Sequence, residues 1–450
     1  MKKNTFHLMS LGCAKNTVDS DSMAQLLVQA KFQPIDDAEQ AGVIIVNTCG
    51  FIGPAKDESL TLLRELAGGK KEGQLLIAAG CLTQRYGQQV AHQVPGLDGI
   101  LGTRRWMDIV DVVQNLRGGE HPAPLYHLPE AADVGRDDAG THRVSVQGAS
   151  AYIKVADGCR RPCAFCAIPL IKGTAVSRPM EAILDDARTL DQMGTREIIL
   201  IAQDTTDYGH DLGIKNGLAK LLDQLVVVTP NVDWLRVMYA YPGYVTDQLI
   251  EVMAAHPQVL TYLDIPLQHA HPDTLKRMRR PANMDWVHRT LGKMRDAMPE
   301  LALRTTFIVG YPGETESEFN ALMDFVESIR FDRVGAFQFS FEEGTASESL
   351  GDPVPEEVKL ERWERLMAAQ QQISLERNQA WVGKTLDVLI EGQGDGISVG
   401  RSYRDAPEID GMVVVESELP IGDLLPIRIT GAMTYDLTGV VDSTKINNGL

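Results

Sequence analysis

The sequence predicts an α/β multidomain protein with an N-terminal doubly wound parallel α/β domain, a central partial (β/α)6 barrel and a small C-terminal β-barrel. Three observations support this prediction. The 450 residues are more than one hydrophobic core usually holds. Up to about residue 378, short apolar runs alternate with amphipathic helical stretches, as in parallel sheets. After residue 381 the pattern changes to short β runs broken by glycine and proline.

The N-terminal domain is expected over residues 1–118. Strands are predicted at 6–11, 43–47 and 75–79, with helical stretches such as 21–30 and 58–66 between them. This order of strands and helices is typical of a parallel, doubly wound sheet. Residues 119–144 are rich in glycine, proline and aspartate and are predicted to form a linker.

The central domain is expected over residues 145–378. It contains six predicted strand and helix units, with strands at 151–156, 197–202, 235–239, 260–265, 304–309 and 334–339. Six units are too few for a closed eightfold barrel, so an open partial barrel is expected. The small β-barrel is predicted over residues 381–446.

The charge balance favours a basic partner over nucleic acid. The formal net charge is -18, whereas nucleic-acid binders usually present a basic face. A local basic groove on an acidic molecule remains an alternative. The sequence has no apolar run long enough for a membrane span or a signal peptide. A cytoplasmic location is therefore expected, where six cysteines more often indicate metal or redox chemistry than disulfides.

Cys159, Cys163 and Cys166 follow a predicted strand at C-x3-C-x2-C spacing, which places them at the C-terminal mouth of the barrel. Iron-sulfur cubes usually take four thiolates, so a run of three leaves one iron open to bind a ligand such as the amino and carboxylate groups of S-adenosylmethionine (SAM). A structural zinc knuckle, which would need a fourth Cys or His nearby, and three unreactive thiols are the alternatives.

The other three cysteines, Cys13, Cys49 and Cys81, each follow a predicted strand. The C-terminal ends of parallel strands line one edge of a sheet, so these thiols are expected to converge although they are far apart in the sequence. This placement predicts a second three-thiolate site. Three ordinary buried cysteines are the alternative.

At the Cys159–Cys166 run the sequence resembles the radical SAM superfamily. With the N-terminal cysteines and the terminal barrel it is similar to the methylthiotransferase family over essentially its whole length. Leu11–Asn16 and Asn47–Ile52 fit the N-terminal motifs of that family. The resemblance implies two 4Fe-4S clusters and two SAM molecules, one as methyl donor and one as radical source. It also implies that the first cluster holds the transferred sulfur, while SAM on the second yields a 5'-deoxyadenosyl radical that removes hydrogen from the substrate.

Residues that contact SAM are predicted at the strand ends. Phe165 lies in the cysteine loop, Gln203 follows the second strand, Gln268 follows the fourth, and Ile308 and Gly310 lie at the end of the fifth. Gly310 would allow close backbone approach to adenine or ribose. A turn that needs glycine for its own geometry is the alternative. The chemistry requires no protein acid, base or nucleophile, so no catalytic residue is expected beyond the cluster ligands.

Two branches of the family differ in substrate: one acts on an adenosine of tRNA, the other on an aspartate of small-subunit ribosomal protein twelve. The runs 172–179, 202–206 and 266–272 resemble the second branch. The C-terminal barrel resembles a TRAM domain, which should be basic where it contacts RNA. Residues 381–441 instead carry four Lys and Arg against ten Asp and Glu. This surface would repel phosphates and attract a basic ribosomal protein.

The run Lys276–Arg280 carries four cations that could hold RNA phosphates, although a solvated helix face is the more common reading. A tRNA methylthiotransferase with the same cofactors is therefore the nearest alternative. A non-enzymatic electron-transfer protein is a more distant one, since such proteins usually have four thiolates per cluster. A reductant such as flavodoxin or ferredoxin is an expected partner, and the substrate could be free or on the ribosome.

Overall fold

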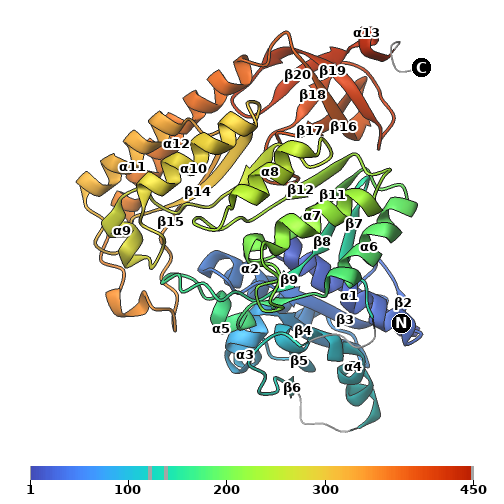
Figure 1. The fold of residues 1–450 in the computed structure, drawn as a ribbon. Helices are drawn as coiled ribbons and strands as arrows, with labels where there is room; N and C mark the ends of the chain where they lie inside the picture. The colour runs from blue at the N-terminus through green and yellow to red at the C-terminus, as the bar shows by residue number, and fades with distance from the viewer. Residues whose placement is uncertain (1, 120–123, 136–139, 447–450) are drawn as a thin grey trace.

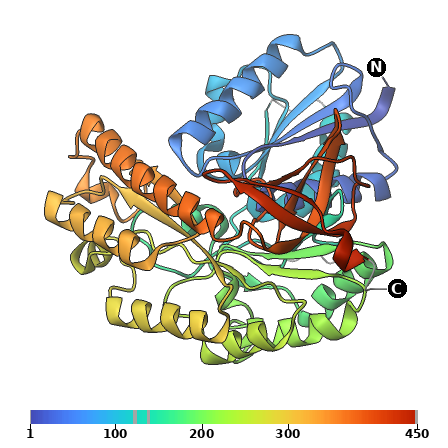
Figure 2. The ribbon, with the colours of Figure 1, turned by 90° about the horizontal axis from the view of Figure 1, so that it is seen from above.

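The computed structural model describes residues 2–119, 124–135 and 140–446. It places the central barrel between an N-terminal α/β domain and a C-terminal β-barrel, with the two chain ends on these outer domains (Figure 1). Figure 2 shows the three parts meeting around the central strands. In the described part of the chain, no helix is long and apolar enough to cross a membrane.

The N-terminal domain contains a six-stranded, all-parallel sheet with the strand order β2-β1-β3-β4-β5-β6. Its strands are β1 (Lys2–Ser10), β2 (Gln33–Pro34), β3 (Ala41–Thr48), β4 (Leu75–Gly80), β5 (Gly99–Gly102) and β6 (Leu125–His127). The covering helices are α1 (Ala14–Gln29), α2 (Gly53–Gly69), α3 (Cys81–Gln93) and α4 (Ile109–Gly118). Every residue of β3 is buried, as expected for a strand with helices on both faces. The predicted doubly wound sheet is confirmed, and its winding reverses between β1 and β3.

Part of the segment predicted to be a linker is ordered structure of this domain. Within residues 119–144, β6 pairs with β5 at the edge of the sheet. Val134 packs into the hydrophobic core of the sheet, and the Arg143 side chain is buried. Glycine and proline indicated a break in periodicity, but a three-residue edge strand tolerates both residues nearby.

The central domain is the predicted open barrel. Its six parallel strands are β8 (Ser150–Lys154), β11 (Glu197–Ile201), β12 (Trp234–Val237), β13 (Tyr262–Asp264), β14 (Ala302–Val309) and β15 (Arg333–Gln338). A parallel bridge between Leu235 and Val259 joins the two groups of three strands. At one edge β7 (Val144–Gln147) runs antiparallel to β8. The outer face carries α6 (Met180–Gln192), α7 (Gly217–Val228), α8 (Asp247–Ala255), α10 (Met284–Ala297), α11 (Glu316–Ile329) and α12 (Glu356–Gln379).

The inner face of the open barrel packs against the N-terminal domain. Ile199 and Ile201 of β11 form one apolar cluster with Tyr152 of β8 and with Ala14 and Val18 of α1. The alternate residues of β11 point outward into the core with the helices. The first turns of α1 therefore pack against the inner face of β8 and β11.

The C-terminal domain is a closed five-stranded barrel, as predicted. Its strands are β16 (Thr385–Gly394), β17 (Ile397–Ser402), β18 (Val413–Val415), β19 (Leu424–Ala432) and β20 (Leu437–Val441). Arg401 pairs with Glu197 at 2.6 Å, and Arg404 pairs with Asp332 at 3.1 Å. Glu197 begins β11, and Asp332 precedes β15. The C-terminal barrel therefore docks on the N-terminal ends of the central strands, away from the mouth.

Candidate functional site

The cysteine loop 159–166 begins at a turn that only glycine can make. Gly158, directly after β9 (Ala156–Asp157), has φ of +72°, and a Cβ there would overlap the carbonyl oxygen of Thr174. The N–H of Cys159 donates to Gly173 O at 3.1 Å, and that of Cys166 to Cys163 O at 3.2 Å. The turn and these bonds fold the loop so that Cys159, Cys163 and Cys166 line one cavity of about 380 Å³.

Desolvation and positive charge both act on this trio. Burial raises the pKa of Cys159 to about 11 and that of Cys166 to about 12. The thiols of Cys159 and Cys166 are therefore protonated at neutral pH, and metal binding there would release protons. The Arg280 guanidinium donates to Cys163 Sγ at 3.5 Å. Arg161, also beside the loop, pairs with Asp204 at 2.6 Å.

Cys13, Cys49 and Cys81 follow β1, β3 and β4, which are neighbours in the sheet. Cys13 caps α1, Cys49 directly follows β3, and Cys81 is the first residue of α3. Burial and then the charge of Cys13 raise the pKa of Cys49, and the pKa of Cys81 rises to about 12 through burial. Cys13 differs, because Lys15 and the N–H of Asn16 outweigh desolvation and lower its pKa. The structure thus brings the three thiols to one sheet edge, as predicted.

Two asparagines of the N-terminal motifs fix this edge. Asn47 Nδ2 donates to Asn16 O at 2.9 Å, and Asn16 Nδ2 donates to Leu11 O at 2.8 Å. Gly80 has φ of +104°, and a Cβ there would lie 2.6 Å from Thr48 O. These contacts hold the start of α1, the end of β3 and the end of β4 together, so they set where the thiols point.

Sulfur spacing separates a cluster from a single ion. A tetrahedral zinc with Zn–S bonds of about 2.3 Å needs sulfurs about 3.8 Å apart. Among the described residues, only His271, Asp273 and Glu318 place three ligand atoms within 4.8 Å of one another, and neither cysteine trio does. Asp273 and Glu318 already pair with Lys276 and Arg277. In the positions that the structure gives them, the sulfurs of neither trio are therefore close enough for a single zinc ion held by three thiolates.

The first trio contacts the segment that directly follows the second trio at one apolar junction. Cys81 packs against Ala167 and Ile171. Ala167 follows Cys166 in the chain, and Ile171 lies in α5 (Ile168–Lys172). Cys81, the third cysteine of the first trio, therefore packs on the residues that directly follow the second trio in the chain.

A buried ionic cluster, here called the junction cluster, surrounds this contact. Asp19 of α1 accepts hydrogen bonds from Lys172 at 2.8 Å, from Arg143 at 2.5 Å and from Lys154. Asp157 accepts from the same three side chains at 3.0 to 3.1 Å. All five residues are buried. Three cations thus face two carboxylates beside two thiolate sites, an arrangement that complements anionic clusters. Sequence reasoning missed it because Asp19 and Lys172 are 153 residues apart.

Four of the five predicted SAM contacts lie at the mouth of the barrel. Phe165 and Ile308 pack on the same apolar cluster. The N–H of Ile308 donates to Gln268 O at 2.8 Å, and Gln268 has a positive φ of 74°. Gln203 carries a buried Oε1 without a hydrogen-bond partner among the described residues. An unpartnered buried acceptor beside the cysteine loop fits a site for a polar cofactor.

Gly310 has a structural reason to be glycine. Its φ is +71°, a Cβ there would overlap the Lys359 side chain, and its N–H donates to the Glu314 carboxylate. The turn geometry anticipated as the alternative is thus present, and a contact with SAM stays a prediction. The basic run 276–280 is also largely engaged within the protein: Lys276 pairs with Asp273, Arg277 with Glu318, and Arg280 donates to Pro266 O.

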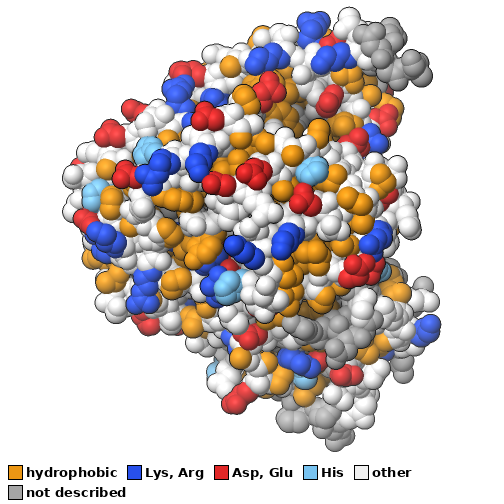
Figure 3. Space-filling model, viewed as in Figure 1, with side chains coloured by type: hydrophobic (Ala, Val, Ile, Leu, Met, Phe, Trp, Pro, Cys, Tyr) orange, Lys and Arg blue, Asp and Glu red, His pale blue; other side chains and the backbone are white. Residues whose placement is uncertain are grey.

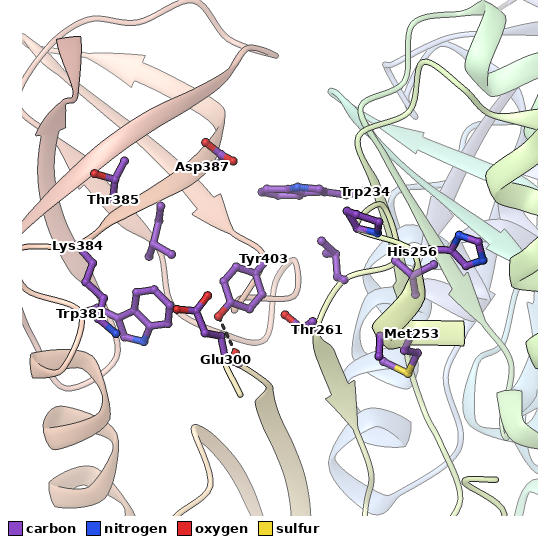
Figure 4. Close-up of a pocket in the computed structure, with 15 residues that line it drawn as sticks. Trp234, Met253, His256, Thr261, Glu300, Trp381, Lys384, Thr385, Asp387 and Tyr403 are labelled. Atoms are coloured by element: carbon purple, nitrogen blue, oxygen red, sulfur yellow. Dashed lines mark hydrogen bonds between the residues drawn. The ribbon is translucent and has the colours of Figure 1, made fainter. Parts of the chain in front are cut away.

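A separate cavity of about 500 Å³ lies between the C-terminal barrel and the central domain (Figure 4). Trp381 and Tyr403 line it from the barrel side, and Trp234 lines it from β12. Tyr403 Oη donates to Glu300 O at 2.6 Å across the junction. No cysteine and none of the predicted SAM contacts line this cavity.

Comparisons with known families divide the chain in the same way. Residues 5–102 match the uncharacterized protein family UPF0004, residues 153–326 match the radical SAM superfamily, and residues 382–441 match the TRAM domain. The three matches fall on the first sheet, the open barrel and the closed barrel, respectively.

Full-length relatives extend these matches. The "Ribosomal protein uS12 methylthiotransferase RimO" of Chloroflexus aurantiacus is 49% identical, with 96% of this chain and 99% of the relative covered. The protein of the same name from Herpetosiphon aurantiacus is 47% identical, with 97% and 99% covered.

Among solved structures, the radical S-adenosylmethionine methyltransferase TsrM from Kitasatospora setae, with cobalamin and a [4Fe-4S] cluster bound, aligns with a TM-score of 0.57. The alignment covers 88% of this chain and 81% of TsrM at 12% identity. The cobalamin-dependent S-adenosylmethionine radical enzyme OxsB aligns with a TM-score of 0.51 over 83% of this chain and 58% of OxsB, also at 12% identity. At this identity the likeness concerns the fold alone.

Proposed function

Because this chain belongs to the ribosomal protein uS12 methylthiotransferase family, we propose that it adds a methylthio group to the β-carbon of an aspartate in uS12. The observation that carries the proposal is the contact of the first cysteine trio with the segment that directly follows the second trio. Cys81 of the first trio packs on Ala167, next to Cys166 of the second. A sulfur-transferring enzyme needs its sulfur source and its radical source at one substrate carbon, whereas a protein with a single radical site does not.

We assign one 4Fe-4S cluster to each trio: Cys13, Cys49 and Cys81 hold the first, and Cys159, Cys163 and Cys166 hold the second. Three thiolates per cluster leave one iron open on each. When bound, the clusters and two SAM molecules supply a transferable sulfur, a methyl group and a hydrogen-abstracting radical. The protein orients these groups and excludes water. Gln203, Gln268, Phe165, Ile308 and Gly310 remain the proposed SAM contacts.

The surface of the C-terminal barrel supports a protein substrate over tRNA. Arg401 and Arg404 are buried in contacts with the central domain. Within residues 381–441, the exposed cations are Lys384 and Arg428, against seven exposed carboxylates: Asp387, Glu391, Asp395, Glu408, Glu416, Glu418 and Asp423. On the face shown in Figure 3, acidic and basic side chains are interspersed and form no single basic patch. The excess of exposed carboxylates on the C-terminal barrel attracts a basic protein and repels phosphates.

The remaining partners follow from this chemistry. Radical formation needs a one-electron reductant, so a flavodoxin or ferredoxin is the proposed donor. The proposed substrate is a ribosomal protein, free or on the assembled subunit, so the proposed place of action is the cytoplasm.

The test is mass spectrometry of uS12 incubated with anaerobically reconstituted protein, SAM, a sulfur source and reductant. The expected result is a methylthio mass increment on one aspartate, with 5'-deoxyadenosine formed alongside. A tRNA transcript with a potential adenosine site serves as the competing substrate. Methylthio adenosine in tRNA with unmodified uS12 would contradict the proposal and favour the tRNA alternative.

A further inference from the structure

Lys15 reaches from the first trio into the mouth of the central barrel. It lies in the first turn of α1, two residues after Cys13, and its Nζ lies 3.3 Å from the centroid of the Tyr239 ring. Tyr239 follows β12 and has a positive φ of 62°, which turns the chain at the strand end. The ammonium group thus lies between the first trio and the strand ends where SAM is expected.

This cation has no carboxylate partner in the described part of the chain. No Asp or Glu there lies within 4.0 Å of its Nζ, whereas Lys154 and Lys172 nearby each contact two carboxylates. Asp264 also acts electrostatically on Lys15, though less than Tyr239 and Cys13 do, and its Oδ1 accepts from Arg304 at 3.0 Å. The charge of Lys15 also acts on the Cys13 thiol, two residues away, and lowers the pKa of that thiol. A partly buried ammonium that no carboxylate neutralises favours the binding of an anion.

The contact with Tyr239 holds the cation without neutralising it. A cation on an aromatic face is attracted by the ring quadrupole and keeps its full charge. Two acceptor atoms at the strand ends of the barrel, Asp264 Oδ2 and Gln203 Oε1, are also buried without hydrogen-bond partners among the described residues. Asp264 is the last residue of β13 and Gln203 follows β11, so both groups lie at the mouth of the barrel, on either side of β12, the strand that Tyr239 follows.

We infer that Lys15 binds the carboxylate of the substrate aspartate and so selects that residue. The inference rests on the proposed function and names the specificity determinant of that reaction. In aspartate the β-carbon is bonded directly to the carboxylate carbon. A cation that holds the carboxylate beside Cys13 therefore places the reacting carbon between the first trio and the barrel mouth. An asparagine or a nucleobase at the same place would leave the ammonium without its counter-ion.

The decisive measurement is the affinity of the reconstituted protein for uS12 and for a uS12 variant whose target aspartate is asparagine. The wild type is expected to prefer aspartate by about tenfold or more, as expected for loss of a charge-assisted hydrogen bond. Lys15→Met should bind both forms alike, and Lys15→Arg should keep the preference for aspartate. The matched control is Lys71→Met, an exposed lysine of the same domain, which should behave as the wild type.

Two further readouts separate a specific role from a structural one. Thermal unfolding of Lys15→Met should match the wild type; if that variant does not fold, Lys15→Gln takes its place. Iron content is measured in every variant and only fully loaded protein is compared, because Lys15 acts on the Cys13 thiol. SAM affinity without uS12 should also be unchanged, because Lys15 is inferred to hold the substrate carboxylate and not the carboxylate of SAM. A variant without the cation that still prefers aspartate would overturn the inference, and so would weakened SAM binding with that preference intact. If the wild type itself fails to modify uS12, the proposed function fails regardless of Lys15.

Discussion

The two cysteine trios carry the same ligands but are built in different ways. The second trio occupies one loop of eight residues whose shape depends on Gly158 and two local backbone hydrogen bonds. The first trio is assembled from the ends of β1, β3 and β4, which come from separate parts of the chain and meet only in the folded sheet. The geometry of the second is thus largely local, whereas that of the first is a property of the tertiary fold.

This difference predicts how each site responds to change. A disturbance of the N-terminal sheet should damage the first trio and spare the second, while damage to the loop should do the reverse. The junction cluster and the packing of Cys81 on Ala167 connect the two sites, so changes there should affect both. The four predictions below test this division, from the largest expected effect to the smallest.

Removing each set of thiols should give distinct losses. Cys159, Cys163 and Cys166 changed together to alanine should remove about half of the reconstituted iron and abolish 5'-deoxyadenosine formation. Cys13, Cys49 and Cys81 changed to alanine should also remove about half of the iron, but SAM cleavage should persist while methylthio product is lost. Iron analysis and chromatography of the nucleoside measure both. Unchanged iron in either variant would refute the two-cluster assignment.

The glycines before the cysteines should break one site each. Gly80→Ala places a side chain at a positive φ and against Thr48 O, and Gly158→Ala does the same against Thr174 O. The left-handed backbone alone costs about 1–2 kcal/mol. The first variant should lose iron from the first trio, and the second variant should lose SAM cleavage. Gly68→Ala, a helical glycine with open space around it, is the control; if all three variants behave alike, local geometry does not set the sites.

Asp19→Asn should weaken the connection between the sites. It leaves Lys154, Lys172 and Arg143 with one carboxylate, and removal of one partner from a buried ion pair typically costs about 3–5 kcal/mol. We expect a lower free energy of unfolding in denaturant titrations, with SAM cleavage retained but poorly coupled to product. Asp21→Asn, on the same helix but outside the junction cluster, is the control. Equal stability of the two variants would show that the junction cluster contributes little.

Neutral substitutions on the C-terminal barrel should leave both trios intact. Asp387→Asn, Asp395→Asn and Glu416→Gln together should slow association with uS12 by a few-fold at low salt, because exposed charges mainly affect encounter rates. Stopped-flow fluorescence at two ionic strengths measures this change. The control neutralises Asp285, Asp296 and Glu327 on outer helices of the central domain. An equal effect of both sets would indicate that only net charge matters.

The strand pattern of the sequence was sufficient for the fold and for the meeting of the first trio. Parallel strands end at a common edge, so Cys13, Cys49 and Cys81 could be placed together from their positions alone. Edge strands such as β6 were missed, because three residues give no periodic signal. Part of the predicted linker is therefore a strand of the first sheet.

Contacts between domains could not be predicted in this way. The partners of the junction cluster have no common spacing, and the Lys15 contact with Tyr239 depends on how two domains pack. Gly310 shows the opposite problem: its glycine was correctly singled out, but the sequence could not distinguish a ligand contact from packing on Lys359. Spacing identifies groups that share an element or a sheet edge, and it says little about groups that meet across an interface.

Cys81 packs against Ala167, which directly follows Cys166. This contact affects how a folded substrate protein can reach the two trios. Under the proposed function, no moving domain has to carry the sulfur. The first trio, which would hold the sulfur, already lies beside the segment of the second trio before the substrate binds. Under the proposed function, the target aspartate has to reach the place where α1 meets the mouth of the barrel, at the contact of Lys15 with Tyr239. The accessibility of that aspartate on the surface of its protein would then limit the reaction together with its charge.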